Sequence, residues 1–522
     1  MGEIVLTMEH SKIPLVSMRG ISKLFFGIHA NQDVDFDLYE GEVHGLLGEN
    51  GAGKTTLMNV LCGIYTPDKG TLSIEGNPVC FLSPKDAITH GIGMVHQHFM
   101  LVPVLSVWEN MLLGLEDVPM VLDREGTIAR IRELSQTYGL EVDPEAKVWQ
   151  LSIGEQQRVE ILKMLYRGTK ILILDEPTSV LTPQEVLDFF ATLRRMTAIG
   201  HAIVLISHKV EEILSIADKL TILRKGKKID TVSSEGITRM QIAEMMVGRP
   251  LGVLEKKEYS GSGAVLLECR DISVRNDRNL PGIKNLSFSL REGEILGVAG
   301  VSGNGQGEMC EALCGLRKID SGHVFMGKKE ITHQTVRERI QGGISYIPVD
   351  RKGTGLIPNM NLRENIALKY YWEKPYREYG CYIRWDRIAS LTADLVRDYN
   401  IAVNDLKTPV RALSGGNLQK LMLSREISKN PKVILAMHPV WGLDVGATEF
   451  VHRQLIKERE QGAGILLISE DLDELLEMSD RILVLCQGEL MGTVEKPQTI
   501  GRDRIGLMMG GEQWTDPAKE SA

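Results

Sequence analysis

The sequence predicts an α/β protein made of two similar domains in tandem, and three observations carry this prediction. The segments GENGAGKT (48–55) and GVSGNGQG (300–307) share one frame, so that Gln306 follows Lys54 after 252 residues. In both halves, apolar runs with strand character, such as ILIL (171–174), alternate with helical patterns, which is typical of a sheet covered by helices. A chain of 522 residues is also long enough to bury two separate cores.

The repeat predicts the elements around each glycine-rich segment. EVHGLLGENGAGKTTLMNVLCGI (42–64) aligns without gaps with EILGVAGVSGNGQGEMCEALCGL (294–316). Leu57, Val60 and Leu61 recur at helical spacing, and the second copy keeps apolar residues at the same places. We therefore expect a strand, a glycine-rich turn and a helix in both copies.

The domain boundaries follow from the repeat and from a change in composition between its copies. We expect a first domain over residues 13–250 and a second over 265–511. Residues 251–264 are short, polar and contain Gly and Ser, so they are predicted to be a linker.

Each domain is also expected to carry a helical subdomain. Residues 98–165 and 350–428 are rich in helical patterns and interrupt the alternation with strands. The second copy has an insertion near residues 370–385, which we expect to be surface loop and helix rather than core.

Bulk composition narrows the class of protein. A formal charge of −9 and a pI of about 5.8 give no basic footprint, so no nucleic acid partner is expected. No apolar run approaches the roughly 18 residues needed to span a bilayer, and the N-terminus lacks the cationic start of a secretory signal. The seven cysteines form no CxxC spacing, which fits a reduced cytoplasm.

The first glycine-rich segment has the GxxxxGK[ST] pattern of a phosphate-binding loop. Backbone N–H groups of residues 51–55, at the start of a helix, present positive potential to phosphates. Lys54 can reach the β- and γ-phosphate oxygens, and the Thr55 hydroxyl can ligate Mg²⁺. The alternative is a glycine-rich turn with a chance lysine, and the flanking strand and helix patterns argue against it.

Two acids at the end of an apolar strand complete a candidate hydrolytic centre. ILILDEP (171–177) places Asp175 where an ionised carboxylate is costly unless it serves a cation. Asp175 suits Mg²⁺ coordination through water, and Glu176 suits the general base that orients attacking water. A strand-end acid pair that caps a helix is the alternative.

Together with LSGGN (413–417) and LSIGE (151–155), these motifs resemble the ATP-binding cassette (ABC) ATPases over almost the whole of both halves. The resemblance implies two ABC ATPase (P-loop NTPase) domains in tandem, each with a β-subdomain, a RecA-like core and a helical subdomain. It also implies that Gln97 is the Q-loop residue that touches Mg²⁺ and water. His208 is then the switch histidine that contacts the γ-phosphate, and Phe25 stacks on adenine.

Cassettes of this family pair head to tail, so each ATP lies between the phosphate loop of one copy and the signature segment of the other, which is LSIGE in the first copy and LSGGN in the second. The resemblance then implies one complete site that uses ATP and Mg²⁺. Its expected residues are Phe25, Gly48, Glu49, Asn50, Gly51, Ala52, Gly53, Lys54, Thr55, Thr56, Gln97, Ser414, Gly415 and Gly416 for ATP, Thr55, Gln97 and Asp175 for Mg²⁺, and Glu176 and His208 for catalysis. Two arrangements stay open: the two cassettes of one chain pair with each other, or they pair with those of a second copy. In the second arrangement the chain would associate with itself.

The other site combines altered groups. They are Gln306, Gly307, Val349, Met437, His438 and Glu470, facing the LSIGE signature with Ile153 in its turn. The losses fall on the lysine, the metal-binding hydroxyl and the metal-binding carboxylate. One lost transition-state donor typically costs about 10²–10³ in rate, and a lost general base roughly 10²–10⁴. We therefore expect one hydrolytic site and one structural or weakly binding site.

The resemblance further implies the ATPase subunit of a membrane importer. It would lie peripherally at the cytoplasmic face of the membrane and bind two transmembrane permease subunits, with an extracytoplasmic solute-binding protein acting indirectly. VDR (349–351) and GLDVGA (442–447) resemble the simple-sugar class, whereas the segments 94–114 and 274–288 favour its nucleoside-importing branch. Nucleosides are the expected solute and monosaccharides such as ribose, galactose or xylose the alternative. A soluble tandem protein that acts on ribosomes is a remote alternative, since the linker is short and the second site degenerate.

An apolar stretch marks the expected contact with the permease. It consists of Phe99, Met100, Leu101, Val102 and Val104 and is expected to be exposed unless a partner covers it. The resemblance places a cytoplasmic coupling helix of the permease against this region. The alternative is that these side chains pack under the helical subdomain.

Overall fold

The computed structural model of the protein describes residues 13–25, 27–96, 99–115, 122–178, 181, 183–207, 209–250, 259, 261, 263–301 and 303–513. The chain divides into two compact units between Gly252 and Val253, inside the segment predicted as a linker. Each unit is an α/β structure, as the repeat predicts. None of the helices in these residues combines the length and apolar content that a bilayer crossing requires.

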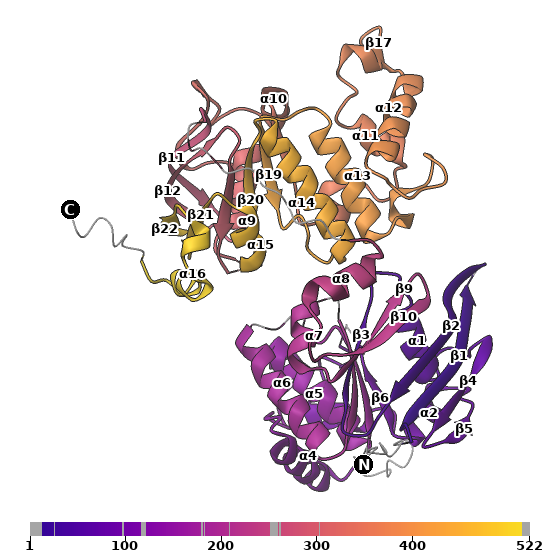
Figure 1. Ribbon diagram of the computed structural model, residues 1–522. Coiled ribbons are helices and arrows are strands. Elements are labelled where there is room, and N and C mark those ends of the chain that lie inside the picture. Colours follow the sequence, from indigo (N-terminus) through magenta and orange to yellow (C-terminus); the bar gives the residue numbers. More distant parts are fainter. Residues whose placement is uncertain are drawn as a thin grey trace, which may run out of the picture. The chain divides into compact units, whose positions relative to one another are not determined.

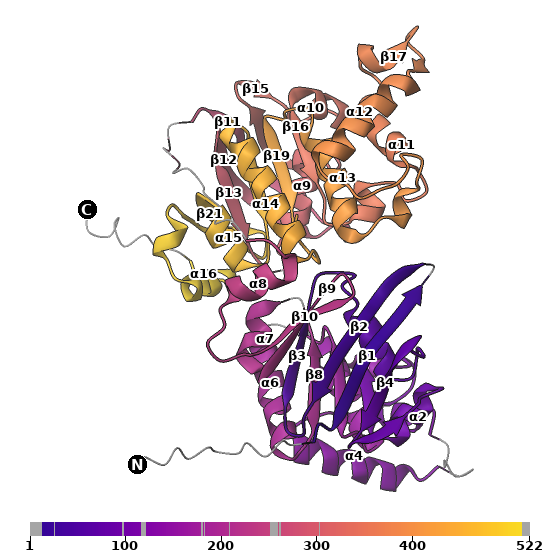
Figure 2. The same ribbon diagram turned by 45° about the vertical axis from the view of Figure 1, so that its right-hand side comes forward.

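The first unit contains two sheets in its described residues. An antiparallel sheet has the order β2-β1-β4-β5, and a larger sheet has the order β10-β9-β3-β8-β7-β6, parallel except for the β9–β10 pair. Figure 2 shows β1, β2 and β4 side by side. The strands are β1 (Val16–Phe25), β2 (Ile28–Leu38), β3 (Val43–Leu47), β4 (Lys69–Ile74), β5 (Asn77–Val79), β6 (Ile92–Val95), β7 (Ile171–Asp175), β8 (Ala202–Ile206), β9 (Lys219–Arg224) and β10 (Lys227–Ser233).

Central parallel strands explain the apolar runs of the sequence. Both β3 and β8 are buried at every position, as expected of parallel strands that are covered on both faces. The helices of the unit are α1 (Lys54–Leu61), α2 (Pro84–Thr89), α3 (Val107–Leu112), α4 (Arg124–Tyr138), α5 (Ile153–Tyr166), α6 (Pro183–Ala198), α7 (Val210–Ile216) and α8 (Arg239–Val247), with a 3₁₀ turn η1 (Val148–Gln150). Among these, α3, α4 and α5 contact one another and form the predicted helical subdomain.

The second unit repeats this plan. Its sheets have the orders β12-β11-β14-β15 and β16-β19-β20-β13-β21-β22, and a separate hairpin pairs β17 with β18. The strands are β11 (Val265–Arg275), β12 (Pro281–Arg291), β13 (Ile295–Ala299), β14 (Ser321–Met326), β15 (Lys329–Glu330), β16 (Ile344–Ile347), β17 (Arg377–Glu378), β18 (Tyr382–Ile383), β19 (Val433–Met437), β20 (Gly464–Ile468), β21 (Arg481–Cys486) and β22 (Glu489–Val494).

Helices cover both faces of the larger sheet of the second unit. Along β19, Val433 and Leu435 pack into the core that includes α9, whereas Ile434 and Ala436 pack into the core beneath α13 and α14. Figure 1 shows α13 and α14 side by side over that face. The helices are α9 (Gln306–Cys314), α10 (Val336–Gly342), α11 (Leu362–Ala367), α12 (Trp385–Asp398), α13 (Gly415–Ile427), α14 (Val445–Glu460), α15 (Leu472–Met478) and α16 (Arg502–Met509), with short turns η2 (Arg351–Gly355), η3 (Lys374–Tyr376), η4 (Val410–Ala412) and η5 (Pro497–Thr499).

The insertion of the second unit differs in part from the prediction. It contains the hairpin of β17 and β18, which the sequence pattern did not indicate. Tyr370 is only 5% exposed and belongs to the core, and its hydroxyl lies 2.6 Å from Ser428 Oγ. The expectation of surface loop and helix outside the core is therefore wrong at Tyr370, because its ring fills space beside the end of α13.

Candidate functional site

The glycine-rich loop of the first unit lies between β3 and α1, as predicted. Gly53 has φ +100°, and a Cβ at this position would lie 2.2 Å from the carbonyl oxygen of Ala30, so only glycine fits. Asn31 Nδ2 donates to the Gly53 carbonyl at 3.1 Å, and the Gly226 amide donates to the Ala52 carbonyl at 3.0 Å. Neighbouring strands thus fix the loop before any ligand binds.

Lys54 places a cation inside this loop. Its side chain is 7% exposed, and Nζ donates to the carbonyls of Gly48 at 2.7 Å and Glu49 at 3.1 Å. These two carbonyls hold the ammonium inside the loop. Asn50, Gly51 and Thr55 are exposed at the surface of the loop, whereas Ala52 is buried and Thr56 is half-buried.

Asp175, at the end of β7, faces the first residues of α1. Thr55 Oγ1 donates to Asp175 Oδ2 at 3.3 Å. Burial and the charge of Glu176 raise the pKa of the Asp175 carboxyl above its ordinary value, and Thr55 and Lys54 oppose this only in part. A buried carboxylate that resists ionisation gains most from a nearby cation.

These oxygen donors fit Mg²⁺. The hydroxyl and carboxylate are hard ligands, and Mg²⁺ in proteins usually keeps several waters and takes one or two carboxylates plus substrate phosphates. Within the described ranges no group of three or more His, Cys, Asp or Glu side chains could hold a metal.

Glu176 lies in a backbone turn shared by both copies. Its φ is +50°, which is unfavourable for a side chain with a Cβ, and its amide donates to the Ile206 carbonyl at 2.9 Å. His438 takes the same place in the second unit, with φ +44° and an amide bond of 2.8 Å to the Ile468 carbonyl. The turn thus belongs to the fold, and the residue in it sets the chemistry.

Of the remaining predicted residues, one has described local contacts and two lie outside the described residues. Phe25 ends β1 and is half-buried, with its ring edge-on to Tyr65 at 5.1 Å and Lys23 Nζ 5.6 Å from its centroid. Gln97 and His208 lie outside the described residues, so their roles stay predictions.

The signature of the second unit forms the N-terminus of α13, where no side chain among the described residues caps the backbone N–H groups. Ser414 is its N-cap residue, and the first turn of α13 contains no acid. Ser414 and Gly415 are exposed and Gly416 is half-buried. Asn417 donates from Nδ2 to Ser414 Oγ at 2.9 Å and accepts from the Ala402 amide. This helix end keeps the positive potential that favours a phosphate.

The signature of the first unit is closed by its own carboxylate. Glu155 Oε2 accepts from the Ser152 amide at 2.7 Å, while Ser152 Oγ accepts from the Glu155 amide at 3.3 Å. These hydrogen bonds from Ser152 lower the pKa of Glu155. The negative charge offsets the helix end, and Ile153 is half exposed beside it. Sequence reasoning noted Ile153 but missed Glu155, which the Ser-x-x-Glu capping pattern could have revealed.

The loop of the second unit keeps its shape without its charges. Gly305 has φ +98°, and a Cβ there would lie 2.3 Å from the Gly282 carbonyl oxygen. Gln306 Nε2 donates to the Val301 carbonyl at 3.1 Å, so an amide closes the loop where the first unit uses an ammonium. A Cβ on Gly307 would lie 3.6 Å from Met437 Cε, so apolar contact replaces the Thr55–Asp175 pair.

Residues on or after β16, β19 and β20 of the second unit also differ from their counterparts in the first unit. Tyr346 OH lies 3.8 Å from Met437 Sδ, and burial raises the pKa of this phenol. Burial lowers the pKa of His438, which favours a neutral ring. Val349 is half-buried and Glu470 exposed, so an acid stands in place of the predicted switch histidine.

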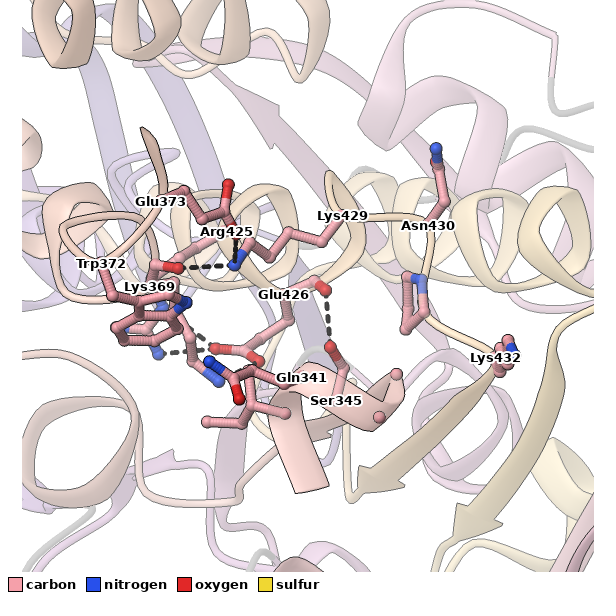
Figure 3. A pocket seen from close by; sticks show the side chains of 14 residues that line it. Gln341, Ser345, Lys369, Trp372, Glu373, Arg425, Glu426, Lys429, Asn430 and Lys432 are labelled. Atoms are coloured by element: carbon pink, nitrogen blue, oxygen red, sulfur yellow. Dashed lines mark hydrogen bonds and ion pairs between the residues drawn. The ribbon is translucent and has the colours of Figure 1, made fainter. Parts of the chain in front are cut away.

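A pocket of about 440 Å³ opens elsewhere on the second unit, and Figure 3 shows its wall. Glu426, 2% exposed, pairs with Lys369 and Arg425, each at 2.9 Å. Burial alone would raise the pKa of Glu426, but the two cations lower it below its ordinary value. Lys429 Nζ lies 4.9 Å from the centroid of Trp372. Four cations and two carboxylates line the pocket, and Glu426 with its two cationic partners forms a buried structural cluster in its wall.

Two α/β units, each with a glycine-rich loop before a helix and a second helix opened by a signature, define a tandem nucleotide-binding cassette protein. The chain belongs to the ABC transporter family, whose profile matches residues 31–179 and 283–439. The predicted fold class is therefore confirmed.

Curated relatives match nearly the whole chain. The nucleoside import ATP-binding protein NupA of Lactococcus lactis subsp. cremoris is 42% identical over 95% of this chain and 98% of that protein. The guanosine import ATP-binding protein NupO of Bacillus subtilis is 42% identical over 97% of this chain and 99% of that protein. The glucose import ATP-binding protein TsgD13 of Haloferax volcanii is 41% identical, covering 95% and 96%.

Proposed function

We propose that this chain is the ATP-hydrolysing subunit of a nucleoside importer and works with one competent ATP site. The observation that carries the proposal is the segregation of charge between the copies. In the first unit, Lys54 and Thr55 start α1 next to the glycine-rich loop and Asp175 ends β7 opposite them, and the signature of the second unit has no acid in the first turn of its helix. The remaining loop and signature carry an amide and a capping acid. Pairing in trans would join the two intact halves and the two altered ones.

Each residue of the competent site has a role that follows from its surroundings. Lys54 would exchange its carbonyl partners for β- and γ-phosphate oxygens. Thr55 and Asp175 would hold Mg²⁺, which supplies charge neutralisation of the phosphates when bound. Glu176, on its strained turn, would accept a hydrogen bond from the attacking water and orient it.

Ser414, Gly415 and Gly416 would approach the γ-phosphate from the second unit. A helix N-terminus stabilises negative charge, and preorganised donors of this kind act most strongly on charge that develops in the transition state. The predicted switch residue His208 would add a donor to the same phosphate group.

Nucleosides are the proposed solute because NupA and NupO are named for nucleoside and guanosine import. TsgD13 is named for glucose import at nearly the same identity, so a monosaccharide is the second candidate. ATPase stimulation in proteoliposomes that contain this chain, its permeases and its solute-binding protein separates the two. Stimulation by guanosine or adenosine, with none by ribose or glucose, is expected, and the reverse pattern would replace nucleosides by sugars.

The permease contact is proposed at the apolar stretch after β6. Met100, Val102 and Val104 are 62%, 38% and 68% exposed. The loop itself is fixed, since Lys163 Nζ donates to the Met100 carbonyl at 2.9 Å and the Val102 amide donates to Asn110 Oδ1 at 2.8 Å. A fixed loop with exposed apolar side chains would form a binding surface for the cytoplasmic coupling helix of a permease subunit. Two such transmembrane subunits are the proposed partners.

Paired substitutions test the proposed site. Lys54→Ala should abolish ATP hydrolysis by the purified chain, because the loop loses its cation. Gln306→Ala should retain most of the ATP hydrolysis, because the side-chain amide of Gln306 only closes the second loop. Loss of turnover in the Gln306 variant with retention in the Lys54 variant would reverse the assignment.

A further inference from the structure

A hydrogen bond in the first unit joins the turn that carries Glu176 to the first turn of α7. Thr178, two residues after Glu176, is 3% exposed, and its hydroxyl donates to Glu212 Oε2. Glu212 lies in the first turn of α7. Its other oxygen, Oε1, accepts from Lys209 Nζ at 2.8 Å. The Glu212 carboxylate is thus shared between the two turns.

Two described residues before the first turn of α7 flank the predicted switch position, which itself lies outside the described residues. Ser207 and Lys209 flank residue 208, and the Lys209 amide donates to Ser207 Oγ at 3.0 Å. The Glu176 amide bonds the carbonyl of Ile206 at the end of β8. Backbone and side-chain bonds therefore tie both turns together from two sides.

The second unit keeps the backbone part of this arrangement and loses the side-chain part. The Asp471 amide donates to Ser469 Oγ at 3.1 Å, as its counterpart does in the first unit. Val440 stands at the position of Thr178 and has no hydroxyl. The carboxylate of Glu474, which corresponds to Glu212, instead lies 2.9 Å from His452 Nε2 on α14 and accepts from Ser469 Oγ at 2.6 Å.

This exchange is specific to the pair of side chains. His452 stands where the first unit has the buried Phe190. In the second unit Glu474 therefore bonds to His452, because Val440 has no hydroxyl to offer in place of Thr178. Both acids therefore have hydrogen-bond partners, but only Glu212 bonds to the turn that holds the hydrolytic carboxylate. The difference follows the proposed division into an active and an inactive copy.

We propose that Thr178 and Glu212 are positioning residues for ATP hydrolysis, which tie the Glu176 turn to Lys209 and the first turn of α7. The inference rests on the proposed function of the first unit. This connection fixes the direction of the Glu176 carboxylate relative to the γ-phosphate side of the site, and neither residue needs to touch ATP. Errors of about 1 Å in such placement can cost on the order of 10²-fold in rate.

Thr178→Val tests the proposal, because it installs the residue of the second unit with nearly the same volume. In the purified full-length chain we expect kcat for ATP to fall about tenfold or more, which corresponds to about 1.4 kcal/mol. The Kd for ATP measured by calorimetry should stay within about twofold, because neither residue needs to touch ATP. Thr178→Ser restores the hydroxyl and should retain most of the turnover. Val440→Thr is the matched control in the second unit and should leave kcat unchanged.

A double variant separates positioning from general damage. If Thr178 acts through Glu212, Thr178→Val combined with Glu212→Ala should lower kcat no further than the more severe single change. Two independent losses would multiply instead and would overturn the proposal even if Thr178→Val is thermally less stable. A kcat equal to wild type in Thr178→Val, or a parallel rise in Kd, also overturns it.

Glu176→Gln in the same preparation distinguishes the failure of this inference from that of the proposed function. When Glu176→Gln abolishes turnover and Thr178→Val does not lower it, only the role of the connection is wrong. When Glu176→Gln turns over like wild type, the assignment of the hydrolytic site itself is wrong.

Discussion

Replacing Glu426 by Gln tests how far buried charge stabilises the second unit. The Glu426 carboxylate lies between Lys369 and Arg425, each at 2.9 Å, and its side chain is almost fully buried. The substitution keeps the volume but leaves two cations without their counter-charge. Removing one partner of a buried ion pair costs about 3–5 kcal/mol. For a domain of this size each kcal/mol shifts Tm by about 2–4 °C, so the transition of the second unit should fall by roughly 6–20 °C.

Differential scanning calorimetry of the full chain measures this shift, and hydrogen exchange in α13 peptides assigns the transition to the second unit. Glu373→Gln is the matched control. Glu373 pairs with Lys429 on the same pocket wall but is partly exposed, so its loss should cost less than about 1 kcal/mol. Equal shifts in the two variants would refute the reasoning from burial.

The pH dependence of the same variant gives a second check. The pKa of Glu426 is lowered in the folded protein, so its stabilising effect is fully present above the unfolded-state pKa, about 4.3. That effect is lost as pH falls through the lowered folded pKa. The Tm difference between wild type and Glu426→Gln should therefore be constant at neutral pH and shrink in acid.

Two further predictions concern the first unit. Asp175→Asn should abolish Mg²⁺-dependent hydrolysis yet raise the Tm of the nucleotide-free chain at pH 7. The raised pKa of Asp175 means that the folded state resists ionisation, which destabilises it above the unfolded-state pKa; an unchanged or lower Tm would contradict this. Met100→Asp should abolish solute uptake in proteoliposomes with basal ATPase retained, since it charges the exposed apolar loop; unimpaired uptake would remove the loop from the permease contact.

Much of the fold could be predicted because local patterns and tertiary structure agree. The apolar runs at 171–174 and 202–206 lie in β7 and β8, since parallel central strands need apolar residues on both faces. The glycine pattern predicted the loop before α1, because Gly53 and Gly305 adopt conformations that a side chain would block. Tyr370 was assigned wrongly, since an insertion is read as surface unless its packing partners are known.

The interactions within the site were less predictable, because they join residues far apart in sequence. Thr178 and Glu212 are separated by 34 positions, and no local pattern marks either one as a partner. The local pattern Ser-x-x-Glu predicts the cap by Glu155. The resemblance to a signature indicated only Ile153 as an altered residue. Chemistry carried by spacing along one element was therefore easier to predict than chemistry carried by contact between elements.

Photolabelling with an azido-ATP analogue after trapping with Mg²⁺ and vanadate tests the single hydrolytic site most directly. Trapped nucleotide should amount to about one per chain, and peptide mapping should locate the label in the first unit, in the peptide that contains Phe25. Lys54→Ala should abolish trapping, and Gln306→Ala should leave it intact. Label trapped beside Gln306, with the loop around Lys54 unlabelled, would contradict the account.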